Sequence, residues 1–391
     1  MIKIKPYSEI LQREEFLNLY RFLTAKAMPF YPEDLFPEGY FYPDGKTKTD
    51  LPYFKRAPRY RTDGYSALFA KYKIPGGDSG PDKARNDAIL AEAIIRENSE
   101  GLHSFLYHGC INGHVSPEKL QQLLLASVGP GALQKLPFLD QALQAGKDRK
   151  DDLLKNVFRY DIFSRQAGIY HLVFLLGVPV CPYCNRLFIT SVEKDNVSTQ
   201  DPAEMRPQLD HYRNKSEYPF LALSIMNLIP SCGVCNHKKS NDPREILYPY
   251  AEGMGDLCSF QVDAERDLTM LTGTGIDEEE LTLRFVKKGP TTPLTGRIDA
   301  SIDLLNLNSL YQSHKRYVSD ILMQRYIFTN DMVNEIAAEY DDLFNNNTRE
   351  VREMLLLGRL DQSHWGDRPL GKLTSDISNE LDYLYCYKEE K

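Results

Sequence analysis

The chain has 391 residues, of which 42% are hydrophobic, 11% aromatic and 26% charged. This composition excludes a disordered protein and provides apolar surface for roughly two or three packed domains. The formal net charge of −8 argues against non-specific nucleic-acid binding over the whole surface, because phosphates must be met by cations. No N-terminal signal segment is visible, and the most apolar run, His171–Val180, is shorter than the roughly 20 residues of a membrane span. We therefore expect a cytoplasmic protein with no membrane contact.

The first 165 residues are predicted to form a mostly helical domain. Apolar residues at helical spacing and their flanking residues predict helices over 8–28, 87–98, 116–129 and 151–164. Residues 29–82 are rich in proline, glycine and aromatic residues and show little periodicity, so a long irregular segment is expected there.

The rest of the chain is predicted to divide into a middle module, residues 166–250, and a C-terminal region, residues 251–391. In the middle module, Asn185–Ser191 is expected to be a short strand, and the polar stretch after it a loop. In the C-terminal region, strands are expected at Phe260–Val262 and Leu281–Val286. Helices are expected after them, from Arg297 to about Asn345 and over 348–358. The predicted fold class is α+β, with helices dominating.

Four of the seven cysteines form two Cys-x-x-Cys pairs, Cys181/Cys184 and Cys232/Cys235. Two such pairs provide the four soft, tetrahedral ligands that Zn²⁺ prefers, and four protein ligands make a structural site. A redox role is disfavoured because no thioredoxin-like βαβ pattern surrounds either pair. The repeated spacing disfavours four unrelated core cysteines. The scattered cysteines are predicted to be small buried residues: Cys110, Cys258 and Cys386.

Polar residues with a chemistry of their own lie between the cysteine pairs, beginning with the adjacent Asp210 and His211. A carboxylate can bind a hard cation such as Mg²⁺ or Mn²⁺ through oxygen. An imidazole, whose ordinary pKa is about 6.5, can accept a proton from water at neutral pH. A phosphodiesterase uses these two groups, although an isolated Asp-His pair is more often a surface pair or a turn.

This pattern resembles the HNH endonuclease family, which has a ββα-metal fold, over residues 181–245. The family order is Cys-x-x-Cys, Asp-His, Asn-Leu and Cys-x-x-Cys followed by His or Asn and then Lys; here these positions are Cys181/Cys184, Asp210-His211, Asn227-Leu228, Cys232/Cys235, Asn236 and Lys239. The resemblance implies that His211 is the general base that activates water. It implies that Asp210 and Asn236 bind a catalytic Mg²⁺ or Mn²⁺ ion, that Asn227 orients the loop holding His211, and that Lys239 lies near the phosphate backbone.

The chain departs from the family pattern at two places. The family often has His where this chain has Asn236, and His237 follows one residue later. Successive residues of a helix point about 100° apart, so the two side chains are not interchangeable. Asn236 is favoured as the ligand of the catalytic metal, with His237 as the alternative. The spacer of residues 185–207 is also long, which predicts an extra loop near the active site.

Two basic segments are candidates for contact with nucleic acid. The first accompanies the motif and contains Arg213, Lys215, Lys238, Lys239 and Arg244. The second, in residues 53–73, interleaves aromatic residues with cations that include Lys55, Arg56, Arg59 and Arg61. Cations and aromatic rings together suit phosphate contact and base stacking. A basic surface loop with buried aromatics, or a docking site for a protein, explains the second segment equally well.

Three blocks inside and beyond the motif, Cys181–Arg186, Lys215–Leu228 and Arg297–Asn308, are similar to bacterial anti-phage HNH nucleases of the Septu and retron-associated type. That resemblance implies a defence nuclease that cuts double-stranded DNA beside an ABC-type ATPase partner. Two other hypotheses remain: a catalytically silent, zinc-stabilised scaffold that binds nucleic acid or protein, and a stand-alone restriction-type nuclease. The sequence does not distinguish DNA from RNA and does not define the oligomeric state or the trigger.

Overall fold

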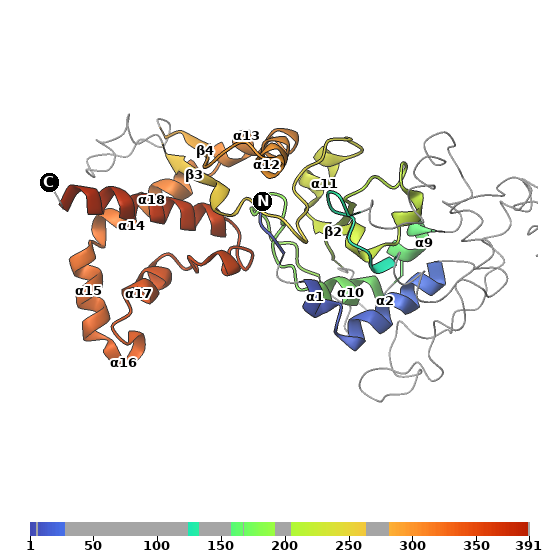
Figure 1. The fold of residues 1–391 in the computed structure, drawn as a ribbon. Helices are drawn as coiled ribbons and strands as arrows, with labels where there is room; N and C mark the ends of the chain where they lie inside the picture. Colours follow the sequence, from blue (N-terminus) through green and yellow to red (C-terminus); the bar gives the residue numbers. More distant parts are fainter. Residues whose placement is uncertain are drawn as a thin grey trace, which may run out of the picture. The chain divides into compact units, whose positions relative to one another are not determined.

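The computed structural model describes residues 1–4, 7–27, 124–132, 158–166, 168–191, 205–262 and 281–389 (Figure 1). These residues form an α+β fold with two small antiparallel sheets. The chain divides into two compact units: unit 1 comprises Met1–Lys5, Val178–Thr190 and Pro230–Lys391, and unit 2 comprises Pro6–Gly177 and Ser191–Ile229. Each unit is assembled from segments far apart in the sequence. The boundaries expected at 165 and 250 stay predictions.

Unit 2 begins with two helices where a single one was predicted over 8–28. They are α1 (Tyr7–Ile10) and α2 (Glu14–Ala27), and residues 11–13 form a turn between them. The first turn of α2 carries Glu14 and Glu15, whose charges favour a helix N-terminus and so explain the new start. The buried face of α2 has helical spacing and consists of Phe16, Leu19, Tyr20, Leu23 and Ala27.

Helices α9 (Tyr160–Ser164) and α10 (Gly168–Leu176) pack against α2. The Phe163 ring meets the Tyr20 ring edge-on, with 6.3 Å between the ring centroids. Helix α10 ends at Leu176, and Gly177 directly after it has a φ of +63°, which suits a glycine. Of the predicted helix over 151–164, the structure describes the last residues. The helix over 87–98 and most of that over 116–129 lie outside the described residues.

The first sheet pairs β1 (Gln208–His211) with β2 (Leu228–Ser231), and α11 (Gly233–Lys239) follows β2 along the chain. Two 3-10 turns, Pro219–Leu221 and Ile225–Asn227, lie between the strands. The strand predicted at Asn185–Ser191 is not formed. A single antiparallel bridge joins Val180 to Phe188 instead, because the chain turns back between them.

The second sheet, in unit 1, pairs β3 (Cys258–Val262) antiparallel to β4 (Leu283–Lys287), with Phe260 opposite Phe285. Both strand predictions in this region are confirmed. Helix α18 (Gly371–Glu389) lies along β3. Its carboxylates accept hydrogen bonds from the strand: Asp376 from the Phe260 N–H at 2.9 Å and Glu380 from the Val262 N–H at 3.2 Å.

The long helical segment predicted from Arg297 to about Asn345 is a series of shorter helices: α12 (Pro293–Leu304), α13 (Leu307–Gln312), α14 (Lys315–Ile327), α15 (Asn330–Glu339) and α16 (Asp341–Phe344). Asn306 separates α12 from α13, and Asn345 follows α16, with left-handed φ angles of 52° and 47°, which asparagine tolerates. Thr329 starts α15 as its N-cap by accepting from the Met332 N–H. The helix predicted over 348–358 is confirmed as α17 (Thr348–Leu355).

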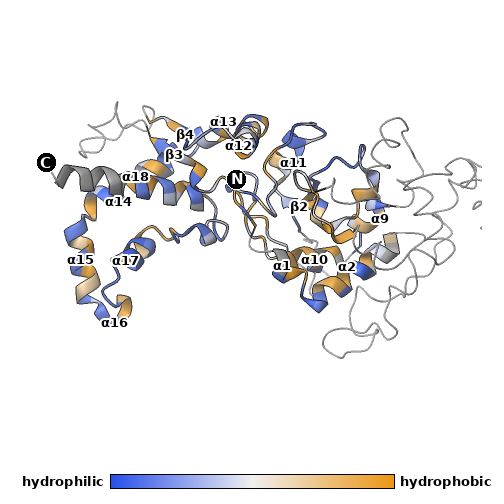
Figure 2. Ribbon diagram, in the orientation of Figure 1, coloured by the Kyte–Doolittle hydropathy of each residue, from blue (hydrophilic) through white to orange (hydrophobic). Residues whose placement is uncertain are grey.

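Hydrophobic and hydrophilic residues are mixed along these helices (Figure 2). Helices α15, α16 and α17 share a small core of Val333, Ala337, Phe344 and Val351. Across the described parts of the chain, no helix combines the length and the apolar character needed to cross a bilayer.

Candidate functional site

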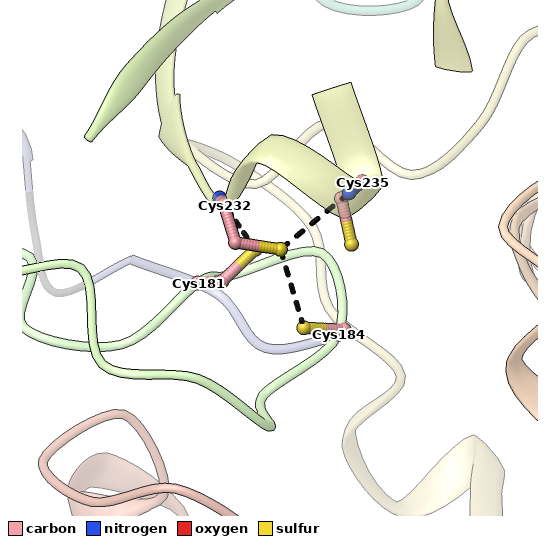
Figure 3. A group of neighbouring side chains, drawn as sticks. All are labelled: Cys181, Cys184, Cys232 and Cys235. Carbon is pink, nitrogen blue, oxygen red and sulfur yellow. Dashed lines mark hydrogen bonds between the residues drawn. The ribbon is translucent and has the colours of Figure 1, made fainter. Parts of the chain in front are cut away.

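The two Cys-x-x-Cys pairs come together in unit 1 and form a four-cysteine cluster (Figure 3). Cys181 and Cys184 come from a turn after Val180, and Cys232 and Cys235 come from the start of α11. All four thiols are buried, and their sulfur atoms lie within 4.8 Å of one another. Such a cluster could hold a metal ion, as the spacing predicted.

The donor set and its spacing fit zinc. A tetrahedral site with Zn–S bonds of about 2.3 Å places its sulfurs about 3.8 Å apart, and the sulfurs of Cys184 and Cys232 are 3.9 Å apart. Burial raises the pKa of the Cys181 thiol, whereas hydrogen bonds from the neighbouring thiols lower the pKa of Cys232. A bound cation favours the thiolate at every ligand, because each anion then faces a positive charge.

Backbone N–H groups point at the sulfurs, which is the arrangement that stabilises thiolates. The Cys232 N–H donates to the Cys181 sulfur at 3.4 Å, and the Cys235 N–H donates to the Cys232 sulfur at 3.5 Å. The second bond makes Cys232 the N-cap of α11. The local fold of α11 and the position of its two ligands are therefore set by the same contact.

Residues from the C-terminal helices hold the first cysteine turn in place. Asn185, with a left-handed φ of 54°, donates from its side chain to the Trp365 carbonyl at 2.9 Å and accepts from the Lys372 N–H at 3.0 Å. The Tyr311 hydroxyl donates to the Cys184 carbonyl at 2.5 Å. The Arg186 guanidinium donates to the His314 ring at 2.7 Å. No sequence pattern identified these partners, because each is more than 120 residues away.

His211 belongs to unit 2 and is the last residue of β1. Its side chain is half-buried, and its Nε2 lies 3.0 Å from the Ala222 carbonyl. Helix α2 stabilises the segment that provides this carbonyl, because the Tyr20 hydroxyl donates to the Leu223 carbonyl at 2.6 Å. The imidazole is thus positioned by a loop that the N-terminal helices support.

Asn227 joins the chain after His211 to the turn before β2. Its side-chain oxygen accepts from the Arg213 N–H at 2.7 Å, and its amide donates to the Arg213 carbonyl at 3.0 Å. A third bond, 3.1 Å long, runs to the Leu221 carbonyl. Because Asn227 is completely buried, these bonds are shielded from water and fix the backbone beside His211.

Tyr160 of α9 is a neighbour of His211 that the sequence did not reveal. The two rings meet edge-on with their centroids 4.3 Å apart. Burial raises the pKa of Tyr160 to about 12, so the phenol stays protonated and donates to the Leu209 carbonyl at 3.3 Å. The Lys215 ammonium lies 4.9 Å from the centre of the Tyr160 ring, which is a cation–π distance.

The residues assigned to the catalytic metal are divided between the units. Asp210, on β1, is buried in unit 2. Asn236 and His237 are on α11 in unit 1, where Asn236 is half-buried and His237 exposed. Among the residues that the structure describes, the four cysteines are the only group of three or more His, Cys, Asp or Glu side chains placed to hold an ion. The Mg²⁺ or Mn²⁺ site stays a prediction.

The cations predicted to meet nucleic acid have different surroundings. Lys215 and Lys238 are exposed, but Lys239 is buried with 4% of its surface accessible. The Arg213 Nε donates to the Val128 carbonyl at 3.1 Å. Arg244 forms ion pairs with Asp242 and Asp303. A phosphate that bound Arg244 would have to displace these carboxylates. The other predicted cations lie outside the described residues: Lys55, Arg56, Arg59 and Arg61.

Three comparisons bear on what this chain is similar to. No protein-family model, no curated protein and no solved structure matches it. What the site can do therefore rests on its own chemistry: a four-cysteine cluster in one unit, and a positioned imidazole in the other.

Proposed function

We propose that this protein is a metal-dependent HNH endonuclease that hydrolyses phosphodiester bonds, with double-stranded DNA as its substrate. Two strands and a helix follow one another as β1, β2 and α11, which is the order of a ββα-metal module. His211 ends the first strand, and the second cysteine pair begins the helix. This order supports the proposal, as does a cysteine cluster with a donor set suited to a structural Zn²⁺ ion.

The observation that carries the proposal is the contact of Asn227 with both polar backbone groups of Arg213. Arg213 is two residues beyond His211, so a buried carboxamide fixes the loop that bears the imidazole. A scaffold without chemistry has no need to hold a half-exposed histidine in this way. A general base, in contrast, must be held in one geometry.

The contacts of His211 indicate which ring nitrogen could act as the base. A carbonyl oxygen only accepts hydrogen bonds, so the contact with Ala222 assigns the ring proton to Nε2. The other nitrogen, Nδ1, is then the basic one and can take a proton from an attacking water. The Tyr160 ring limits rotation of the imidazole. A neutral, oriented histidine is what the removal of a proton from water requires.

Asp210 and Asn236 are the oxygen ligands assigned to a catalytic Mg²⁺ or Mn²⁺ ion, with His237 as the alternative to Asn236. Such an ion supplies charge neutralisation at the phosphate and at the leaving oxygen. One carboxylate and one amide suit it, because Mg²⁺ retains several waters and takes further oxygens from the substrate. Lys238, exposed on α11, provides a cation for the phosphate backbone.

Cleavage of supercoiled plasmid in the presence of Mg²⁺ or Mn²⁺ tests the proposal. His211→Ala should lower the cleavage rate by at least about 100-fold, because it removes the general base. His171→Ala is the matched control: His171 belongs to the same unit and contacts Glu15 at 3.2 Å. Its variant should cut like the wild type. Equal cleavage by the wild type and His211→Ala would overturn the mechanism, and no cleavage by either would favour a binding scaffold.

A further inference from the structure

Exposed apolar side chains are concentrated in one part of unit 1. Most of the large hydrophobic residues with exposed side chains, among those the structure describes, lie on or beside α14 to α17: Met323, Tyr326, Ile327, Met332, Tyr340, Leu343, Met354 and Leu357. Single exposed hydrophobics are normal, but a group within one helical segment marks an interaction site. Methionine and tyrosine are also enriched at protein interfaces.

Four apolar residues form a stripe at helical spacing along α15 and α16, and three of them are exposed. Met332, Ile336 and Tyr340 are four residues apart, and Leu343 follows in α16. Met332 is 41% exposed, Tyr340 57% and Leu343 66%. The small core shared with α17 uses the next positions, Val333, Ala337 and Phe344. Met332, Tyr340 and Leu343 therefore lie beside this core, whereas Ile336 is half-buried and packs against it.

Acidic residues border the stripe on its other side. Asp331, Glu335, Glu339 and Asp342 each directly precede a stripe residue, so they form a parallel row about 100° around the helix. With Asp341 added, α15 and α16 contain five carboxylates and no lysine or arginine. A protein that binds this surface must combine apolar side chains with flanking cations.

Leu357 supplies an independent observation. It follows α17 with a left-handed φ of 49° and is 72% exposed. Glycine normally occupies this position after a helix, and here Gly358 is one residue further on. A bulky apolar residue in this strained and exposed position contributes little to the packing of the chain itself, so it adds apolar surface beside α17.

We propose that the stripe of Met332, Ile336, Tyr340 and Leu343 docks an amphipathic helix of a partner protein whose apolar face is flanked by lysines and arginines. A second copy of the chain fits less well, because a symmetric contact would bring two acidic rows together. The stripe matches an apolar helix face at spacings of three and four residues, and the carboxylates match its cations. This surface is separate from the chemistry proposed for His211 and does not rest on it.

Two fluorescently labelled synthetic helices test this docking by anisotropy on the full, zinc-loaded chain. Both carry leucine at the same helical spacing, one flanked by lysine and the other by glutamate. The basic peptide should bind at least about tenfold more tightly than the acidic one, by charge complementarity. Combining Tyr340→Ser with Leu343→Ser should weaken its binding about tenfold. Combining Glu335→Lys with Glu339→Lys should reverse the preference between the peptides.

Phe174→Ser is the matched control, since Phe174 is 61% exposed but belongs to α10 in unit 2. It should leave peptide binding unchanged. Hydrogen exchange on α15 and α16 should slow when the basic peptide is added, and unchanged melting temperatures should show that the variants are folded. Equal binding of the two peptides, equal weakening by Phe174→Ser, or unchanged exchange of α15 and α16 when the basic peptide is added would overturn the proposal. So would a dimer in sedimentation that Leu343→Ser dissociates.

Discussion

The cysteine cluster and the His211 strand are built on different principles. The cluster gathers four identical soft donors within 4.8 Å of one another, so its chemistry can be recognised from the donors alone. His211 is a single imidazole, and its orientation depends on a carbonyl, an aromatic ring and a buried amide from separate segments. The comparison teaches that a candidate metal site can be recognised from short sequence spacings, whereas the role proposed for His211 depends on the residues that hold its imidazole.

The largest effect is expected when the cluster loses a ligand. Cys232→Ser should abolish zinc binding, because Cys232 belongs to the cluster that could hold the ion and is also the N-cap of α11. Structural zinc sites contribute on the order of 10 kcal/mol, so unit 1 should lose cooperative unfolding. Metal content by mass spectrometry and calorimetric unfolding measure both effects. Cys258→Ser is the control: Cys258 is buried outside the cluster, so that variant should keep its zinc.

A smaller effect is expected from the residue that fixes the backbone beside His211. Asn227→Ala leaves backbone groups of Arg213 and Leu221 without their partner in a buried site. The free energy of unfolding should fall by about 3 kcal/mol, and nuclease activity should fall with it while the zinc content stays constant. Urea denaturation and plasmid cleavage provide the two readouts. A stable but inactive variant would show that Asn227 acts on the imidazole and not on stability, unlike the cysteines of the cluster. A fully active variant would show that Asn227 has no part in the proposed mechanism.

Tyr160 tests whether aromatic packing orients the imidazole. Tyr160→Ala should cost about 2 kcal/mol of stability and lower activity, because the ring that meets His211 is lost. Tyr160→Phe keeps the ring and removes the bond to the Leu209 carbonyl, so it should cost about 1 kcal/mol and restore activity. Imidazole proton shifts of His211 by NMR report ring orientation directly. A Phe variant as inactive as the Ala variant would assign the role to the hydroxyl instead.

The smallest effect concerns a carboxylate of unit 1 away from the cysteines. Burial raises the pKa of Glu380 to about 7, from the ordinary glutamate value of about 4.3. The folded state thus binds the Glu380 proton more tightly than the unfolded state does. The protonated carboxyl therefore contributes its full stabilisation below the pKa of the unfolded state, and this stabilisation is lost as pH rises through 7. The stabilisation by bound zinc has the opposite pH dependence: it falls as pH falls, because acid protonates the thiolates. Glu380→Gln should therefore add about 1 kcal/mol at pH 8 and almost nothing at pH 4.5. Unfolding free energies measured at both pH values would decide this, and equal gains would contradict it.

Some features followed from local patterns. The two Cys-x-x-Cys pairs, the strands β3 and β4, and α17 were predictable because a short spacing or a period of a few residues defines each of them. Cys258 is buried as expected. The long helical segment was only partly predictable. Asn306 separates α12 from α13 with a left-handed backbone, but the later breaks, at Ser313–His314, Phe328–Thr329 and Tyr340, have ordinary negative φ angles.

The sequence by itself determined the donor set for a metal and the order of the residues around His211. Only the tertiary structure decided which residues support them: Tyr311 and Trp365 at the cysteine turn, and Tyr160 and Ala222 at the imidazole. The division of the chain into two interleaved units is likewise a tertiary property. The physical reason is range. Ligand spacing and helical periodicity act over a few residues, whereas packing contacts and buried hydrogen bonds join segments whose separation in the sequence carries no signal.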